Sequence, residues 1–316
     1  MIPDSLSLFR AIIEMLVPVA VGVILTKAGV LNEDFAKKLS VFVLYVGTPF
    51  LLVTSINAIP YSPEMLRSGA LVMLATLLTH LIAIGVSLAA TAPIRDRPAV
   101  FVSSCSMTFS NCGLFGFPLL KAAYGDVGVF WGSFFNVVFN FLVWSYGVFI
   151  LSRANPALKI KPVKIFFNAG TIPCFIGLLI YLFRIPLYGP LTAGMERIAA
   201  VCSPTAMVII GIMIAGLPLR KLLFSFLPYY TVLIKQLVIP LAVGMLLRLI
   251  GIPFDISVFC ALMIALPSAT TTAMFAENYD IRPELAAQNV GMTTILSLVT
   301  VPFAMRLLDR LLALVF

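Results

Sequence analysis

Two interrupted apolar stretches decide the fold of this chain: residues 109–118 read FSNCGLFGFP, and residues 266–273 read LPSATTTA. Each places glycine or proline and small polar residues inside an otherwise hydrophobic segment. Proline and glycine interrupt a helix and free backbone amides and carbonyls, which lipid tolerates only where they line a cavity or find partners. Both stretches are therefore predicted to break a membrane helix.

The two stretches belong to an internal repeat with a step of 155 residues. Pro267 lies one step after Cys112, so the two breaks coincide when the halves are superimposed. Four prolines of the first half find a proline at the same offset: Pro18, Pro49, Pro63 and Pro98 recur as Pro173, Pro204, Pro218 and Pro253. A repeat at half the length of an apolar chain predicts a carrier with two-fold symmetry.

The composition indicates a polytopic membrane protein without a separate soluble domain. Hydrophobic residues make up 61% of the 316 residues and charged residues 11%, whereas a soluble chain carries about twice that share of charge. The net charge of +8 comes from basic residues in short loops, which reports topology rather than nucleic-acid binding. The five cysteines form no CxxC motif and are expected to be small buried residues, not disulfides or metal ligands.

Ten apolar segments are long enough to cross a bilayer at about 20 residues each. Five precede a polar linker at 152–164 and five follow it, and an odd number of spans per repeat makes the repeat inverted. We therefore expect an all-α membrane fold in which 1–153 is the first five-helix repeat, 154–164 a linker and 165–316 the second repeat. The expected spans are 9–31, 38–59, 68–92, 98–121, 128–151, 165–187, 196–217, 228–250, 257–277 and 286–308.

Basic residues favour one orientation in the plasma (inner) membrane. Twelve Lys and Arg residues fall on the side that contains the 152–164 linker, and eight fall on the other side. Cytoplasmic loops carry the excess of positive charge, so the linker is predicted to be cytoplasmic and both termini to face outward.

Interrupted helices at matching places in two repeats indicate a carrier's binding site. The N-terminus of a half-helix presents free amides and a positive dipole, worth about 0.3–2 kcal/mol to an anion such as a carboxylate. The alternative is that both breaks are packing kinks, because Gly, Pro, Ser and Thr are common in membrane helices. On the first interpretation, the substrate-binding residues of the two breaks are Ser110, Asn111, Cys112, Gly113, Pro267, Ser268, Ala269 and Thr270.

Further polar residues lie inside the apolar spans. His80 and Lys235 share the 155-residue step, and a mid-membrane Lys costs about 2.5–3.5 kcal/mol, so it usually has a function. Both are predicted to approach the crossing breaks. Lys235 would neutralise helix C-terminal ends as a sodium ion would, and His80 would couple transport to protons. Alternatively, His80 bonds a carbonyl and Lys235 snorkels.

Asparagines in the fifth and tenth spans complete the candidate set. They occupy polar stripes on helix faces, where they would bind substrate or, alternatively, hydrogen-bond to neighbouring helices. These residues are Asn136, Asn140 and Asn289.

The breaks and their surroundings resemble the auxin efflux carrier family, which includes plant PIN-FORMED auxin carriers and bacterial members related to malate and malonate permeases. The resemblance covers essentially all ten spans, and the family's crossover asparagine corresponds to Asn111. It rests mainly on residues 47–50, 110–119, 123–125, 203–211 and 266–279.

The resemblance implies two inverted five-helix repeats, as in bile-acid symporters and sodium/proton antiporters. Helices 1, 2, 6 and 7 would form a scaffold. Helices 3–5 and 8–10 would form a transport domain that moves like an elevator, with broken helices 4 and 9 crossing at the site. The chain departs from plant members at 109–111, which read FSN instead of Leu-Pro-Asn, and at 268–272, so auxin is not the expected substrate. The long regulatory loop of plant members is replaced by 152–164.

The expected function is secondary transport of a small organic anion of the carboxylate class across the lipid bilayer. No cofactor and no nucleic-acid partner are expected; H⁺ or Na⁺ is a candidate coupling ion, and a homodimer through the scaffold helices is a candidate assembly. A channel- or receptor-like membrane protein is the alternative. An intramembrane enzyme is disfavoured, because His80 is the only histidine and no HExxH or GxSxG motif occurs.

Overall fold

The computed structural model describes residues 5–154, 171–216, 225–278 and 280–315. Almost all of the predicted linker 154–164 lies outside these ranges, as do the first residues of the sixth predicted span. The described residues are helical with no strand, and one isolated bridge joins Ser110 to Ser268. Within these described ranges, five helices are long and apolar enough to cross a membrane: Glu33–Asn57, Pro63–Thr91, Cys112–Ser152, Gly189–Gly216 and Phe226–Leu249.

The first half of the chain forms long helices joined by short turns. Its elements are α1 (Ser5–Lys27), α2 (Glu33–Phe42), η1 (Val43–Gly47), α3 (Thr48–Asn57), α4 (Pro63–Thr91), α5 (Arg97–Thr108), η2 (Cys112–Gly116), α6 (Phe117–Leu142), η3 (Val143–Gly147) and α7 (Val148–Ser152). The four elements named η are π-helical turns, each containing one wider turn within a longer helix, and such turns are frequent at functional sites.

The second half is also helical. Its elements are α9 (Thr171–Leu182), α10 (Gly189–Gly216), α12 (Phe226–Leu233), η4 (Ile234–Val238), α13 (Ile239–Leu249), α14 (Phe254–Ala265), α15 (Thr270–Asn278) and α16 (Pro283–Val315).

Short polar side chains fix where several helices begin. Asn32 accepts a hydrogen bond from Phe35 N at the start of α2, and Ser62 accepts one from Met65 N at the start of α4. Asp96 caps α5 in the same way. Each cap satisfies a backbone amide that has no partner within its own helix.

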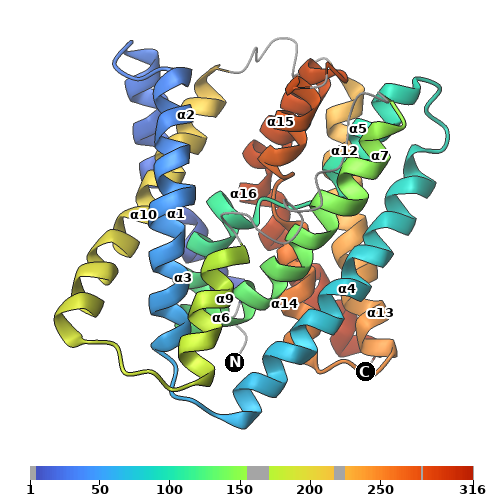
Figure 1. Cartoon of the computed structure of the whole chain (residues 1–316). Helices are drawn as coiled ribbons and strands as arrows, with labels where there is room; N and C mark the ends of the chain where they lie inside the picture. Colours follow the sequence, from blue (N-terminus) through green and yellow to red (C-terminus); the bar gives the residue numbers. More distant parts are fainter. Residues whose placement is uncertain (1–4, 155–170, 217–224, 279, 316) are drawn as a thin grey trace.

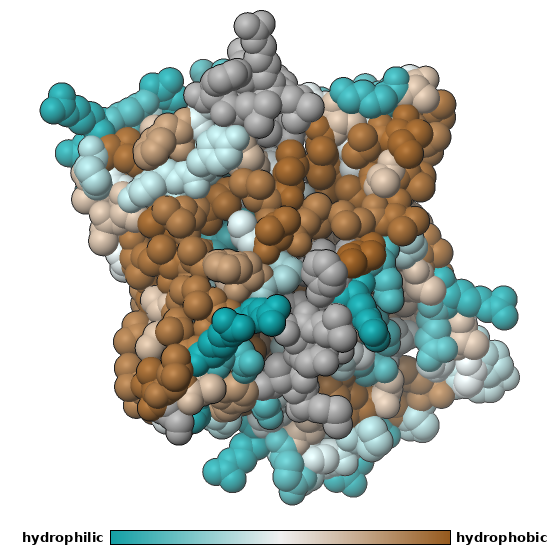
Figure 2. All heavy atoms as spheres, turned by 180° about the vertical axis from the view of Figure 1, so that it is seen from behind, coloured by the Kyte–Doolittle hydropathy of each residue, from teal (hydrophilic) through white to brown (hydrophobic). Residues whose placement is uncertain are grey.

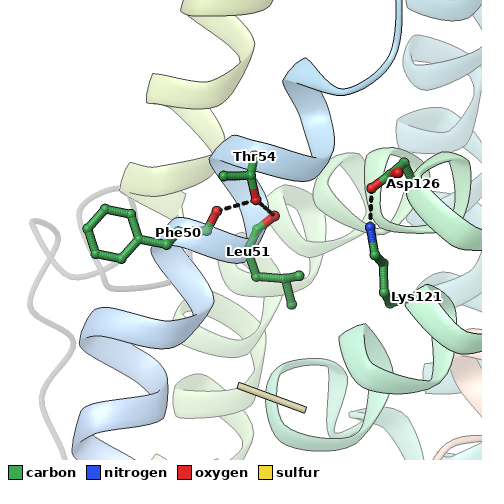
Figure 3. A network of polar contacts seen from close by, with 5 residues as sticks. All are labelled: Phe50, Leu51, Thr54, Lys121 and Asp126. Carbon is green, nitrogen blue, oxygen red and sulfur yellow. Dashed lines mark hydrogen bonds and ion pairs between the residues drawn. The ribbon is translucent and has the colours of Figure 1, made fainter. Parts of the chain in front are cut away.

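A turn at Gly125 divides α6 between the predicted fourth and fifth spans. Gly125 has φ 63° and ψ −145°, a backbone conformation that favours glycine because it has no Cβ. Lys121 and Asp126 form an ion pair across this turn (Figure 3). Figure 3 also shows Thr54 of α3, whose hydroxyl donates a hydrogen bond to Phe50 O within its own helix.

Most helix contacts fall into two groups, and α6 also packs against α1, α3 and α9 between them. In the first, α1 crosses α10, and α3 packs against α9 and α10. In the second, α4 packs against α5, α6, α13 and α14, while α16 packs against α5, α12, α13 and α15. Figure 1 shows α1, α2 and α10 on one side of the molecule and α4, α12 and α13 on the other.

The surface fits a molecule surrounded by lipid. Figure 2 shows a broad hydrophobic region on one face, with most hydrophilic residues at its upper and lower rims and a smaller group in the lower centre. Large apolar side chains on several helices are exposed, including Phe175 at 60% and Val299 at 71%.

Candidate functional site

Two helices are interrupted at the centre of the molecule. Helix α5 ends at Thr108, Phe109 is extended with φ −104° and ψ 135°, and the helix resumes at Cys112. Helix α14 ends at Ala265, and α15 begins at Thr270. Both interruptions fall where the sequence places them. Their physical cause is glycine, proline and small polar residues within apolar helices.

The two interrupted segments cross and pair with each other. Asn111 N donates to Pro267 O at 2.8 Å, and Ala269 N donates to Phe109 O at 3.0 Å. These bonds are antiparallel, like two residues of a β-ladder, and they satisfy backbone groups that the helix breaks release. Two backbone hydrogen bonds between the segments therefore stabilise the crossing.

One serine in each break donates a hydrogen bond to the other broken helix. Ser110 Oγ donates to Ile264 O at 3.1 Å, close to the C-terminal end of α14. Ser268 Oγ donates to Ser106 O at 2.8 Å, close to the end of α5. Both serines are fully buried. The two bonds run in opposite directions across the crossing, so each break is tied to the last turn of the other broken helix.

Lys235 lies at the same place, and its side chain is fully buried. Its Nζ donates to Met107 O at 3.3 Å, to Ile264 O at 3.3 Å and to Ser110 Oγ at 3.1 Å. An ammonium group has three donors, and three acceptors surround it here. Two of them are carbonyls in the last turns of α5 and α14, where the helix dipole is negative. The lysine therefore compensates both C-terminal ends.

The N-terminal ends of the interrupted helices offer hydrogen-bond donors. Asn111 caps η2, because its Oδ1 accepts a bond from Leu114 N at 3.2 Å. Its side-chain NH₂ makes no hydrogen bond to any described residue. At the start of α15, Thr272 N bonds Ala269 O, and the hydroxyl of Thr271 has no partner among the described residues. Thr270 is the first residue of α15.

Helix α16 supports the second break. Thr293 Oγ1 accepts a bond from Ser268 N at 3.0 Å, and Asn289 Nδ2 lies 3.4 Å from Ser106 Oγ. Asn289 is fully buried, and its Oδ1 has no partner among the described residues. Gln236 Nε2 in turn donates a hydrogen bond to Thr293 O at 2.7 Å.

His80 lies beside the first break. Its ring centroid is 6.0 Å from Phe109 and 5.5 Å from Phe135, and the side chain is fully buried. Nδ1 lies 2.9 Å from Thr76 O, which can only accept, so Nδ1 carries the proton. Nε2 is then an acceptor, and it has no hydrogen-bond partner in the described structure.

Asn136 and Asn140 make their hydrogen bonds with each other and toward α9. Asn140 Nδ2 donates to Asn136 Oδ1 at 2.9 Å, and Asn136 Nδ2 lies 3.8 Å from Cys174 Sγ on α9. The pair therefore faces the junction between α6 and α9. Cys112 and Gly113 follow Asn111 in η2, with Cys112 buried.

Sequence reasoning missed two residues of this site, Ser106 and Gln236. Ser106 belongs to the run SSCSMT at 103–108, and Gln236 directly follows the buried lysine. A glutamine inside an apolar span is costly unless it is hydrogen-bonded, and this was the available signal. Within the described ranges, no group of three or more His, Cys, Asp or Glu residues is placed to hold a metal ion.

Comparisons with known proteins indicate the family of this chain. A family model described as "Membrane transport protein" matches residues 7–164 and 154–305. An "Uncharacterized transporter" of Methanothermobacter thermautotrophicus is 27% identical over 306 residues, which cover 93% of this chain and 96% of that protein. Both comparisons indicate a transporter and not a class of enzyme. The chain belongs to the membrane transport protein family, that is, to the auxin efflux carrier family which its crossover segments resemble.

Proposed function

We propose that this protein is a secondary carrier that binds a small organic anion of the carboxylate class at the crossing of α5–η2 and α14–α15. It would transport this anion by elevator-like alternating access. The family supports membrane transport, and the class of substrate is inferred from the chemistry of the crossing.

The observation that carries this proposal is the position of Lys235. Its ammonium bonds Met107 O and Ile264 O, in the last turns of the two half-helices. The negative ends are thus compensated by the protein itself. The positive ends remain available to an anion, with Asn111 Nδ2 and the Thr271 hydroxyl as additional donors.

We further propose ten spans in two inverted repeats. The scaffold would comprise α1, α2–η1–α3, α9 and α10. The remaining helices would form the transport domain, with both termini outside and the linker in the cytoplasm. The packing of the helices into two groups supports this division. The exposed apolar side chains of α9 and α10 suit lipid or a second copy of the chain.

The binding site is tested by a thermal-shift screen of the purified carrier against malate, malonate and other small carboxylates. A ligand that binds the folded state raises the melting temperature with concentration. We expect a carboxylate to do so for the wild type and not for Asn111→Ala. Asn32→Ala, which alters an asparagine cap at the start of α2, is the control that keeps the ligand response. An equal ligand shift in Asn111→Ala rules out the proposed site.

A second proposal concerns coupling to protons through His80. The observation that favours it is the buried, unpartnered Nε2 beside Phe109 of the first break. Histidine changes charge near neutral pH, so a proton could be taken up here during transport. We expect uptake into proteoliposomes to depend on a pH gradient in the wild type and not in His80→Gln. Equal uptake by the wild type with and without a pH gradient disproves this role.

A further inference from the structure

Tyr181 of α9 holds the connector 58–62, through which the chain passes from α3 to α4. Its hydroxyl donates a hydrogen bond to Pro60 O at 3.2 Å and accepts one from Ser62 N at 3.1 Å. A phenol has one proton to donate and lone pairs to accept, so both capacities are used. The side chain is only 3% exposed. The Tyr181 hydroxyl therefore forms hydrogen bonds with the connector residues on both sides of Tyr61.

The ring of Tyr181 makes two further contacts. Its centroid is 5.4 Å from that of Tyr61 in the connector and 5.3 Å, edge to face, from that of Phe130 in α6. On Tyr61, the guanidinium carbon of Arg184 lies 4.1 Å from the ring centroid. These are favourable aromatic and cation–π geometries. Tyr181 thus contacts the connector and α6 at once.

These contacts cross from one helix group to the other. Helix α9 packs against α3 in the first group, where Asn57 Nδ2 also donates to Gly177 O at 3.2 Å. Helix α4 in the second group begins at Pro63, and the hydroxyl of the preceding Ser62 caps its first turn. Any displacement of α4 and α6 relative to α9 must strain or break the bonds of Tyr181 to Ser62 and its contact with Phe130.

We propose that Tyr181 is a latch that stabilises the arrangement of the two helix groups present in this structure. The latch rests on the proposed elevator movement, because it acts only if the groups change position. It lies outside the crossing, so it sets the balance between conformations and leaves the binding residues untouched. Loss of its hydroxyl removes two hydrogen bonds from this arrangement only.

The test measures the conformations directly and needs no substrate. Spin labels are attached to Lys38→Cys on α2 and Arg95→Cys after α4, both exposed positions in different helix groups. The five native cysteines are buried and remain unlabelled. Pulsed EPR distances are recorded in liposomes for this labelled protein, for the same protein with Tyr181→Phe, and for a control with Tyr188→Phe. Tyr188 is a 72%-exposed tyrosine, and its hydroxyl makes no hydrogen bond to a described residue.

We expect two distance populations, one of which fits this structure. Tyr181→Phe should lower that population relative to the other by about fivefold or more, the effect of losing two neutral hydrogen bonds. Tyr188→Phe should leave the ratio unchanged. Two populations with an unaltered ratio in Tyr181→Phe overturn the latch and leave the elevator standing. A single distance in every variant overturns the elevator proposal and the latch with it.

Discussion

At the scale of single residues, the site is defined by one buried cation. A lysine at mid-membrane without a carboxylate partner is expensive unless its donors are satisfied. Lys235 meets this condition through two helix carbonyls and Ser110 Oγ. In the fixed-cation role that we propose for Lys235, its charge takes the place of a bound sodium ion at the ends of α5 and α14. The expected consequence is a carrier that needs no sodium ion at this place.

Lys235→Met tests that consequence. Methionine keeps the length and apolar stem of the side chain but has no charge, so the two C-terminal ends lose a compensation worth about 0.3–2 kcal/mol each. We expect carboxylate uptake into proteoliposomes to fall about tenfold or more, with partial recovery in high sodium. Lys121→Met, at an exposed ion pair, serves as the control. Full activity of Lys235→Met without sodium contradicts the fixed-cation role.

At the scale of helices, the first group is held by a close crossing of α1 and α10. A Cβ added at Gly22 would lie 2.3 Å from Val208 O, and one added at Gly211 would lie 2.2 Å from Val19 O. Real carbon and oxygen atoms do not approach this closely, so both positions require glycine. The two backbones thus touch directly, as in other membrane helix pairs with small residues at the interface. Such contact suits the proposed role of this group as the rigid scaffold against which the transport domain moves.

Gly22→Ala should destabilise the protein, because the added methyl group forces the two backbones apart. We expect a loss of about 1–3 kcal/mol, as for other overpacked positions. Gly85→Ala is the matched control, since Gly85 lies in α4 with open space around its Cβ position. There, alanine should be neutral or slightly stabilising, because glycine is a weaker helix former. Thermal unfolding in detergent measures both, and equal melting temperatures for the two variants contradict the tight crossing.

At the scale of the whole molecule, the distribution of basic residues predicts the orientation of the carrier in its membrane. Twelve basic residues fall on the linker side and eight on the other. The positive-inside rule then predicts that the linker lies in the cytoplasm. The turns that join the described helices are short, so the orientation is predicted mainly from these basic residues.

A labelling experiment tests this orientation. We expect a cysteine introduced at Lys159 in the linker to react with a membrane-impermeant maleimide only after intact cells are permeabilised. A cysteine at Arg67, near the N-terminal end of α4, is predicted to lie on the outer side and should react without permeabilisation. The buried native cysteines provide a low background. Reversed labelling of the two positions disproves the orientation.

The sequence predicted the places of the two breaks because their cause is local. Glycine, proline and small polar residues at 109–118 and 266–273 release backbone bonds wherever the rest of the chain lies. The long apolar helices followed from composition in the same way. The boundary between the fourth and fifth predicted spans also fell near its turn, because Gly125 marks it.

What the sequence by itself determined is thus a repeated, helical membrane chain with two breaks and buried basic residues beside them. Only the tertiary structure decided which groups meet: Lys235 with both helix ends, Gln236 with Thr293, and Asn136 with Cys174. The physical reason is that helix propensity and polarity act over a few residues. Which face of a helix meets which neighbour depends on packing between segments far apart in the chain.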